Sequence, residues 1–262
     1  MTQPTATGPH PLARLGVIVV AAGRGERLGA SVPKAFTSIG GRSLLEHALC
    51  TVASLPGGGQ LVLVVPQDRA AEVLELVAAS PAEAHGWHVA VVAGGRERHE
   101  SVRFGIEALV PSIDTVLVHD AARPLTSGAL FARVAAEVHR TGEAVVPGSP
   151  VADTLKRVTA DGIVQETVSR ADLVAVQTPQ GFPRELLEAA HAGLGARGSA
   201  HALPTDDAEV VQLAGGHVRV VPGELRAHKL TTAADAALLE ALWQASVGRA
   251  DSTGAARDGE DR

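Results

Sequence analysis

Aromatic residues are almost missing from the sequence, which contains four Phe, two Trp and no Tyr among 262 residues. Hydrophobic residues still make up 45% of the chain, so its core must consist of Val, Leu, Ile and Ala. This composition suits a parallel sheet covered by helices on both faces. The absence of Tyr also excludes a Tyr-Lys catalytic pair, which argues against the nicotinamide oxidoreductases that use one.

Cysteine, positive charge and long apolar runs are scarce as well. The single cysteine, Cys50, excludes an internal disulfide and fits a reducing compartment. A net charge of −6 argues against a general nucleic-acid binder, which needs a concentrated basic surface. No apolar run is long enough for a membrane span, and the first 14 residues lack the features of a signal peptide. These absences predict a soluble, cytoplasmic protein with no nucleic-acid and no membrane partner.

Short Val-rich runs alternate with amphipathic segments through most of the chain. Buried strands are expected at 16–21, 61–65, 88–93, 115–119 and 143–147. Helices are expected at 43–54, 70–79, 100–110, 128–139, 185–194 and 233–246. The alternation predicts an α/β fold with a doubly wound, mostly parallel sheet. Ligands of such sheets bind beyond the carboxyl ends of the strands.

The expected organisation is a single domain over residues 15–248. The flanking segments 1–14 and 249–262 are polar and lack periodicity, so they are predicted to be disordered tails. Within the domain, residues 148–180 interrupt the alternation of strands and helices. Short Val- and Thr-rich runs there flank the turn sequence TADG, which predicts a β-hairpin arm projecting from the main sheet.

The glycine-rich segment AAGRGERLGASVPKAF (21–36) follows the first expected strand and can be matched against three phosphate-binding patterns. The dinucleotide fingerprint fails because Leu28 stands where the third glycine is needed. The Walker A pattern fails because Lys34 is followed by Ala35 instead of Ser or Thr. The pattern Gly-x-Gly-x-Arg, with Pro-Lys six and seven residues after the arginine, fits without adjustment. That pattern is the loop of nucleotidyltransferases.

The residues of this loop suit a triphosphate. Gly23 and Gly25 let backbone amides approach phosphate oxygens closely. Arg27 and Lys34 supply positive charge, and Pro33 stiffens the backbone immediately before the lysine.

Lysine is rare in this chain: of 23 basic residues, only Lys34, Lys156 and Lys229 are lysine. A chain that otherwise uses arginine keeps lysine where a compact ammonium group is needed, which favours functional roles for Lys34 and Lys229. The alternative is chance in an arginine-rich composition, and for Lys156 the two interpretations are equally supported.

A second motif, VLVHDAARPL (116–125), places Asp120 at the carboxyl end of an expected buried strand. A carboxylate at that position suits Mg²⁺ or a substrate hydroxyl, and Arg123 suits an anion or the orientation of Asp120. For this motif alone, the alternative is a structural Asp-Arg pair that ties down the loop.

With these two segments the sequence resembles the 2-C-methyl-D-erythritol 4-phosphate cytidylyltransferases of the non-mevalonate isoprenoid pathway. The resemblance covers about residues 15–247 and rests on five motifs together: AAGxGxRxG…PK, VHDAARP, DTLKR, TPQGF and GG..R..S. Ribitol-5-phosphate cytidylyltransferases share much of this pattern and are the alternative. A nucleotide-binding regulator without activity would leave Lys229 and Asp120 unexplained.

The resemblance implies transfer of CMP from CTP to a polyol phosphate, with Mg²⁺ or another divalent cation. It implies a Rossmann-like domain that forms a homodimer through its β-arm. Catalytic roles on the triphosphate are implied for Arg27, Lys34 and Lys229. Nucleotide contacts are implied for Ala21, Ala22, Gly23, Gly25, Gly95 and Ser101. The implied polyol-phosphate site comprises Asp120, which is also the metal ligand, with Arg123, Thr154, Arg170, Thr178 and Thr205. Thr154 and Arg170, on the arm, would reach the substrate of the other subunit.

Some of these positions have competing interpretations. Thr205 precedes a helix start in which Asp206 is the N-cap and Glu209 completes a capping box. The family pattern before the second lysine is Asp-Asn-x-Lys, and this sequence departs from it, with Arg226 where the aspartate is expected. Either Glu224 replaces the missing carboxylate or Asp120 acts alone.

Overall fold

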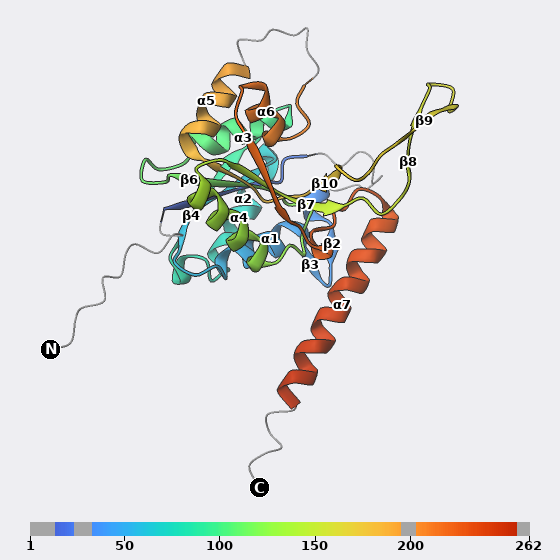
Figure 1. Cartoon of the computed structure of the whole chain (residues 1–262). Coiled ribbons are helices and arrows are strands. Elements are labelled where there is room, and N and C mark those ends of the chain that lie inside the picture. The colour runs from blue at the N-terminus through green and yellow to red at the C-terminus, as the bar shows by residue number, and fades with distance from the viewer. Residues whose placement is uncertain (1–13, 24–32, 195–202, 256–262) are drawn as a thin grey trace, which may run out of the picture.

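A mixed eight-stranded sheet forms the centre of the protein (Figure 1). The structure is a computed structural model that describes residues 14–23, 33–194 and 203–255. The strand order is β10-β7-β11-β6-β1-β4-β5, and β12 pairs with β7. The strands are β1 (Leu15–Val20), β4 (Gly59–Val65), β5 (Trp87–Ala93), β6 (Thr115–Asp120), β7 (Ala144–Pro150), β10 (Val174–Val176), β11 (Gln180–Pro183) and β12 (Val218–Pro222).

The half of the sheet formed by β6, β1, β4 and β5 is entirely parallel. All five strands expected from the Val-rich runs are present, and helices cover both faces, so the predicted α/β class is confirmed. The short strands β10, β11 and β12 were not predicted. Strands β10 and β11 run antiparallel to their neighbours, and β12 runs parallel to β7.

Six of the described helices match the six predicted amphipathic segments, and one further helix is present. They are α1 (Leu44–Ala53), α2 (Ala70–Ala78), α3 (Arg98–Glu107), α4 (Gly128–Thr141), α5 (Arg184–Leu194), α6 (Asp207–Leu213) and α7 (Ala233–Ala255). Short 3₁₀ turns lie at η2 (Lys34–Phe36), η3 (Gln67–Arg69), η4 (Glu83–His85) and η5 (Leu225–Ala227), and a small β2–β3 hairpin (Ser38–Ile39, Arg42–Ser43) precedes α1. Helix α6 begins as its sequence indicated, because the Asp206 side chain accepts a hydrogen bond from Glu209 N at 2.8 Å.

Each face of the sheet has its own apolar core, because successive side chains of a strand point to opposite faces. On β1, Val17 and Val19 pack with helices α1, α2 and α4, whereas Ile18 packs with α3, α5 and α6. Helix α3 lies very close to β1 because its middle carries Gly105. A Cβ there would lie 2.5 Å from Cγ2 of Ile18. This close packing fixes α3, whose first turn borders the site described below.

The predicted β-hairpin arm is present, formed by β8 (Leu155–Val158) and β9 (Val164–Val168), and it projects from the body of the molecule (Figure 1). It is shorter than the predicted range 148–180, because the two ends of that range belong to β7, β10 and β11 of the main sheet. Its turn is closed by the hydrogen bond from Gly162 N to Thr159 O at 3.0 Å. Gly162 has a φ of +80°, which favours glycine. The side chains of Val158, Ile163 and Val164 at the tip are more than half exposed.

Helix α7 extends beyond the domain boundary expected from the sequence. A disordered tail was predicted from residue 249, whereas the helix continues to Ala255. Extending an existing helix costs much less than starting one, and no proline interrupts this segment. The predicted tail 1–14 lies almost wholly outside the described residues, as does 256–262. Among the helices that the structure describes, none is both long and apolar enough to cross a bilayer.

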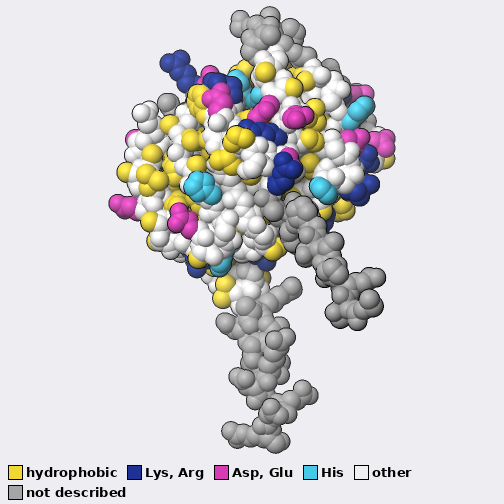
Figure 2. Space-filling model, turned by 90° about the vertical axis from the view of Figure 1, so that its left-hand side faces the viewer, with side chains coloured by type: hydrophobic (Ala, Val, Ile, Leu, Met, Phe, Trp, Pro, Cys, Tyr) yellow, Lys and Arg dark blue, Asp and Glu magenta, His cyan; other side chains and the backbone are white. Residues whose placement is uncertain are grey.

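The face shown in Figure 2 carries acidic and basic side chains interspersed with apolar ones. No broad patch of one charge is visible there among the described residues.

Candidate active site

A cleft of about 1320 Å³ opens at the carboxyl ends of β1, β5 and β6. It is lined by four chain segments that lie far apart in the sequence: 20–23, 94–104, 120–122 and 229–231, together with Lys34 and Ala35. Sites on open α/β sheets form at this edge. The first glycine-rich loop, the Asp120 motif and the second lysine therefore meet as the sequence predicted. Gly25 and Arg27 lie outside the described residues.

The loop after β5 is held rigidly against the end of β1. A Cβ on Gly94 would lie 2.2 Å from Cβ of Ala22, so only glycine permits this approach of the two loops. Glu100 Oε2 accepts hydrogen bonds from Arg96 N at 2.8 Å and Glu97 N at 3.2 Å. These contacts fix the loop before any ligand binds.

The residues expected to bind the nucleotide surround this part of the cleft. Ala21, Ala22, Gly23, Gly95 and Ser101 all line it. The Ser101 hydroxyl accepts a hydrogen bond from Gly95 N at 3.1 Å and donates one to Glu97 O at 3.2 Å. Ser101 therefore shapes the loop from a buried position.

Asp120, the last residue of β6, lies at the floor of the cleft between two cations. Its Oδ1 accepts from Arg98 Nη2 at 3.2 Å, and its Oδ2 accepts from Lys229 Nζ at 2.7 Å. Burial alone would raise the pKa of Asp120, but the charges of Arg98 and Lys229 hold it well below the usual range for a carboxyl. The carboxylate is therefore ionised at neutral pH.

The chain around Lys229 is held by Asp235, near the start of α7. The Asp235 carboxylate accepts from Thr231 N at 2.9 Å, Thr232 N at 2.7 Å and His228 Nε2 at 2.8 Å. Hydrogen bonds lower the pKa of Asp235, and those from the side chains of Thr231 and His228 have the largest effect. Leu230 N also donates to Ala122 O at 2.8 Å, which joins this segment to the loop after Asp120.

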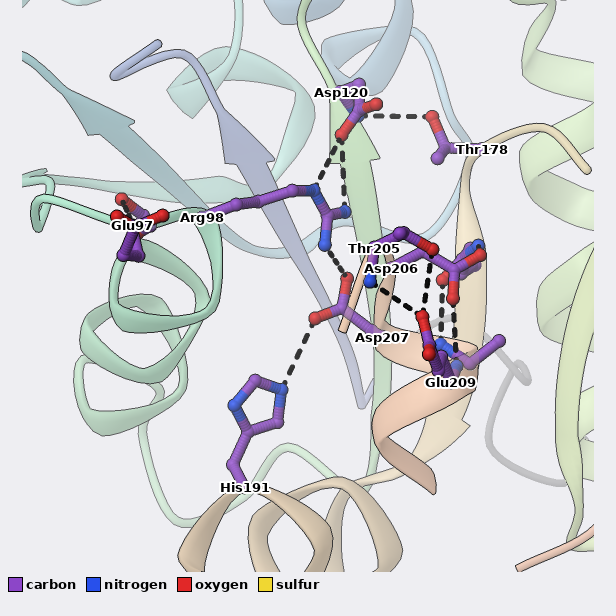
Figure 3. Close-up of polar contacts among 12 residues, drawn as sticks. Glu97, Arg98, Asp120, Thr178, His191, Thr205, Asp206, Asp207 and Glu209 are labelled. Atoms are coloured by element: carbon purple, nitrogen blue, oxygen red, sulfur yellow. Dashed lines mark hydrogen bonds and ion pairs between the residues drawn. The ribbon is translucent and has the colours of Figure 1, made fainter. Parts of the chain in front are cut away.

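Arg98 was not identified from the sequence. Its guanidinium bridges two carboxylates, donating to Asp120 on one side and to Asp207 Oδ2 at 2.7 Å on the other (Figure 3). The GG..R..S motif contains this arginine, so the signal was present in the sequence. Nothing in that motif indicated that its partner is the first residue of a helix 109 positions later.

Two predicted substrate residues have structural partners behind the cleft. Arg123 donates to Ala227 O at 2.6 Å and Val176 O at 3.2 Å, so it braces the segment before Lys229. Burial lowers the pKa of Arg123. The Thr178 hydroxyl accepts from Asp120 N at 3.1 Å and lies 3.0 Å from His119 Nδ1. Burial lowers the pKa of His119 to about 4, so that its ring is neutral.

Three further predicted substrate residues lie away from the cleft of the same chain. Thr205 donates from both its N and its hydroxyl to Glu209 Oε2 (Figure 3). Asp206 is the N-cap as predicted, but Glu209 bonds to Thr205 and does not complete the predicted capping box. Thr154 immediately precedes β8 and is exposed. Arg170, which follows β9, is exposed and donates to Val151 O at 3.4 Å.

Glu224 does not take the place of the carboxylate missing before Lys229. Its two carboxylate oxygens accept from Ser127 N at 2.6 Å and Ser127 Oγ at 2.7 Å, at the start of α4. Of these two carboxylates, Asp120 lines the cleft and Glu224 does not. The described residues contain no cluster of three or more His, Cys, Asp or Glu side chains that could hold a metal.

A glycine-rich turn, two lysines and an ionised carboxylate at the carboxyl edge of an α/β sheet define a nucleotidyltransferase. Residues 15–245 match the sequence model of the family IspD, 2-C-methyl-D-erythritol 4-phosphate cytidylyltransferase. The chain belongs to this family, as its motifs predicted.

Individual relatives agree with this assignment. The chain is 44% identical to the 2-C-methyl-D-erythritol 4-phosphate cytidylyltransferase of Rhodococcus opacus, over 90% of this chain and 97% of that protein. It is 50% identical over 94% of its length to a bifunctional enzyme IspD/IspF of Clavibacter michiganensis, of which it spans 58%. The crystal structure of 2-C-methyl-D-erythritol 4-phosphate cytidylyltransferase from Thermus thermophilus matches with a TM-score of 0.69 and 36% identity, over 87% of this chain and 97% of that one. These similarities do not favour the ribitol phosphate alternative.

Proposed function

We propose that the protein transfers CMP from CTP to 2-C-methyl-D-erythritol 4-phosphate, giving 4-diphosphocytidyl-2-C-methyl-D-erythritol and pyrophosphate. A phosphate oxygen of the polyol forms a bond to the α-phosphorus, and the bond from that phosphorus to the oxygen bridging to the β-phosphate breaks. Family membership supports the substrates. The observation that carries the chemistry is the convergence of Lys34, Lys229 and Asp120 on one cleft beside the turn 21–23.

The reaction needs positive charge more than it needs a base. A phosphate monoester is largely dianionic near neutral pH, because its second pKa is about 6, so its oxygen is already a nucleophile. The obstacle is the approach of one polyanion to another. Lys34 and Lys229 offset that repulsion, and the rigid loops align the attacking oxygen opposite the pyrophosphate leaving group. Arg27 is assigned to the same triphosphate.

Asp120 is proposed as the protein ligand of Mg²⁺. Magnesium is commonly held by one or two carboxylates together with substrate phosphates, so a single ionised carboxylate in a nucleotide cleft fits it. When bound, Mg²⁺ would neutralise phosphate charge and hold the triphosphate in the orientation for in-line attack. Oδ1 of Asp120 accepts from both Nε and Nη2 of Arg98, whereas Oδ2 accepts from Lys229 and keeps a second lone pair that could bind the ion.

Recognition of the cytosine is assigned to the loop after β5. Phe104 is the one aromatic side chain among the described residues that line the cleft, so a stacking cage is not supported. The amides of Gly94, Gly95, Arg96 and Glu97 already donate within the protein, so the backbone carbonyls of this loop are the groups proposed to meet the base edge.

The proposal includes a homodimer in which the arms are exchanged. The two-stranded β8–β9 sheet projects from the body, and isolated hairpins are marginally stable in water. A second subunit would cover the exposed Val158, Ile163 and Val164. It would also bring Thr154 and Arg170 to a polyol phosphate. A cytoplasmic location completes the proposal, since one cysteine fits a reducing compartment.

The function is tested by measuring pyrophosphate release from CTP in the presence of each candidate acceptor. Rapid release with 2-C-methyl-D-erythritol 4-phosphate and little with ribitol 5-phosphate is the expected result, with the nucleotide product identified by mass spectrometry. Preferential use of ribitol 5-phosphate would replace the proposed acceptor, and no release with either would contradict the function.

A further inference from the structure

A chain of polar contacts runs from helix α5 to the cleft (Figure 3). His191 Nε2 lies 3.3 Å from Asp207 Oδ1, Asp207 Oδ2 accepts from Arg98 Nη1 at 2.7 Å, and Arg98 Nη2 lies 3.2 Å from Asp120 Oδ1. Asp207 is fully buried and is not among the residues that line the cleft, whereas Arg98 lines it. Arg98 therefore joins a buried carboxylate to one that faces the ligand.

Fold stability does not account for this arrangement. The Asp207 side chain is fully buried while that of Arg98 is 28% exposed, and a carboxylate taken out of water beside such a partner is often no more stabilising than well-packed apolar residues of similar volume. Arg98 is also the first residue of α3, where the helix dipole disfavours a cation. An ion pair with one fully buried member, whose cation lies at the start of a helix, points to a role at the cleft.

The geometry of the guanidinium suits it to hold Asp120 in one orientation. Asp207, at the start of α6, holds one edge of the Arg98 fork, so the opposite edge faces Asp120 with both Nε and Nη2. The planar guanidinium presents two forks of fixed geometry to two carboxylates, whereas the rotatable ammonium of lysine lacks that fixed geometry. Asp120 then presents its other oxygen to Lys229 at 2.7 Å.

We infer that Arg98 and Asp207 are positioning residues of the transferase: Asp207 anchors Arg98, and Arg98 fixes Asp120 against Lys229. The inference rests on the proposed function, in which Asp120 and Lys229 act on the bound nucleotide. Both new residues act on the reaction through Asp120.

The variant Asp207→Asn tests this inference because it weakens the anchor without altering the cleft wall. Its kcat is expected to fall about 10- to 100-fold, the loss typical of residues that orient a functional side chain by a hydrogen bond. The KM for CTP should stay near that of the wild type. In an Asp120→Asn background the same substitution should have almost no further effect, because the residue through which it acts is already altered. Arg98→Lys should behave as Asp207→Asn does: it should lower kcat in the wild-type background and have almost no further effect in the Asp120→Asn background.

A matched control separates positioning from a general loss of stability. Arg184 donates to Glu188 Oε1 at 2.6 Å and to Val110 O at 2.6 Å, away from the cleft. Arg184→Lys should lower Tm with kcat unchanged. If Asp207→Asn does not fold, Arg98→Lys decides the question in the same double-mutant cycle.

An unchanged kcat in the folded Asp207→Asn or Arg98→Lys variant would overturn the inference. An equal fold loss of kcat in the wild-type and Asp120→Asn backgrounds would also overturn it. Failure of the wild-type chain to transfer CMP would contradict the proposed function itself, which is a different result.

Discussion

The ammonium nitrogen of Lys229 lies 2.7 Å from Oδ2 of Asp120, although the two residues are 109 positions apart in the sequence. One follows the 3₁₀ turn η5, and the other ends β6. An ammonium has three donors, so a single bond to Asp120 leaves Lys229 two for phosphate oxygens. The carboxylate thus holds the cation at the edge of the cleft, where the triphosphate is proposed to bind.

Replacing either cleft lysine should remove most of the activity. Lys34→Ala and Lys229→Ala are each expected to lower kcat about 100- to 1000-fold, or about 3–4 kcal/mol, by analogy with the loss of one transition-state donor. Steady-state pyrophosphate release measures the effect, and circular dichroism checks the fold. Lys156, the third lysine, donates to Thr167 on the exposed arm, so Lys156→Ala serves as the control with near-normal kcat. Near-normal turnover in Lys34→Ala or Lys229→Ala would remove that lysine from the proposed mechanism.

The enzyme should prefer CTP and require a divalent cation. The loop after β5 lines the cleft and is proposed to read the base, and Asp120 is the carboxylate proposed to bind the metal with the triphosphate. Turnover with CTP should greatly exceed turnover with ATP, GTP or UTP. EDTA should abolish turnover, and excess Mg²⁺ should restore it. Equal rates with the purine nucleotides, or full activity in EDTA, would show that this interpretation of the cleft is wrong.

Sequence reasoning succeeded where a residue's role follows from its own strand or loop. The Val-rich runs predicted the buried strands, and Asp120 could be placed at the active edge because it ends one of them. Arg98 and Asp207 could not be paired in this way, since their contact depends on how α3 and α6 pack on one sheet face. The short strands β10 and β12 have exposed residues and little apolar periodicity, so pairing with β7 decides their structure.

Glu224→Gln should weaken the fold and leave the metal requirement unchanged. Its carboxylate binds the backbone and hydroxyl of Ser127, so losing one charged acceptor should cost about 1–2 kcal/mol of unfolding free energy. The dependence of rate on Mg²⁺ concentration should match that of the wild type. Asp120→Asn is the comparison variant, in which that dependence should shift to higher Mg²⁺. A similar shift in Glu224→Gln would place Glu224 at the metal after all.

His47 should make the protein less stable as the pH falls from 7 to 5. Burial lowers the pKa of His47 below its ordinary value of 6.5, against the opposing hydrogen bond to Ile39 O. Below pH 6.5 the unfolded chain therefore binds a proton that the folded chain excludes, and the free energy of unfolding falls by at most about 1.4 kcal/mol per pH unit. Urea unfolding at several pH values should show a smaller slope for His47→Gln. His88 is exposed, so His88→Gln should keep the wild-type slope.

The arm provides a test of whether each active site is built from two chains. Arg170 and Thr154 lie on or beside an exposed hairpin and outside the cleft of their own chain. A symmetric exchange of arms would carry them to the neighbouring cleft, where the fork of Arg170 can bind two phosphate oxygens. The alternative is a monomer in which the arm has no catalytic role. Arg170→Ala alone should then leave kcat unchanged, whereas exchange predicts a large loss.

Mixing two inactive variants distinguishes these cases. In a dimer of one Arg170→Ala subunit and one Lys34→Ala subunit, exchanged arms place both lesions in one site and leave the other site intact. Random pairing makes half of the dimers mixed, so about a quarter of wild-type activity should return after subunits are allowed to exchange. Mixing Lys34→Ala with Lys229→Ala is the control: both lesions lie in the cleft, every site keeps one of them, and no activity should return. If verified heterodimers of Arg170→Ala and Lys34→Ala also remain inactive, each site is formed by a single chain and the arm has another purpose.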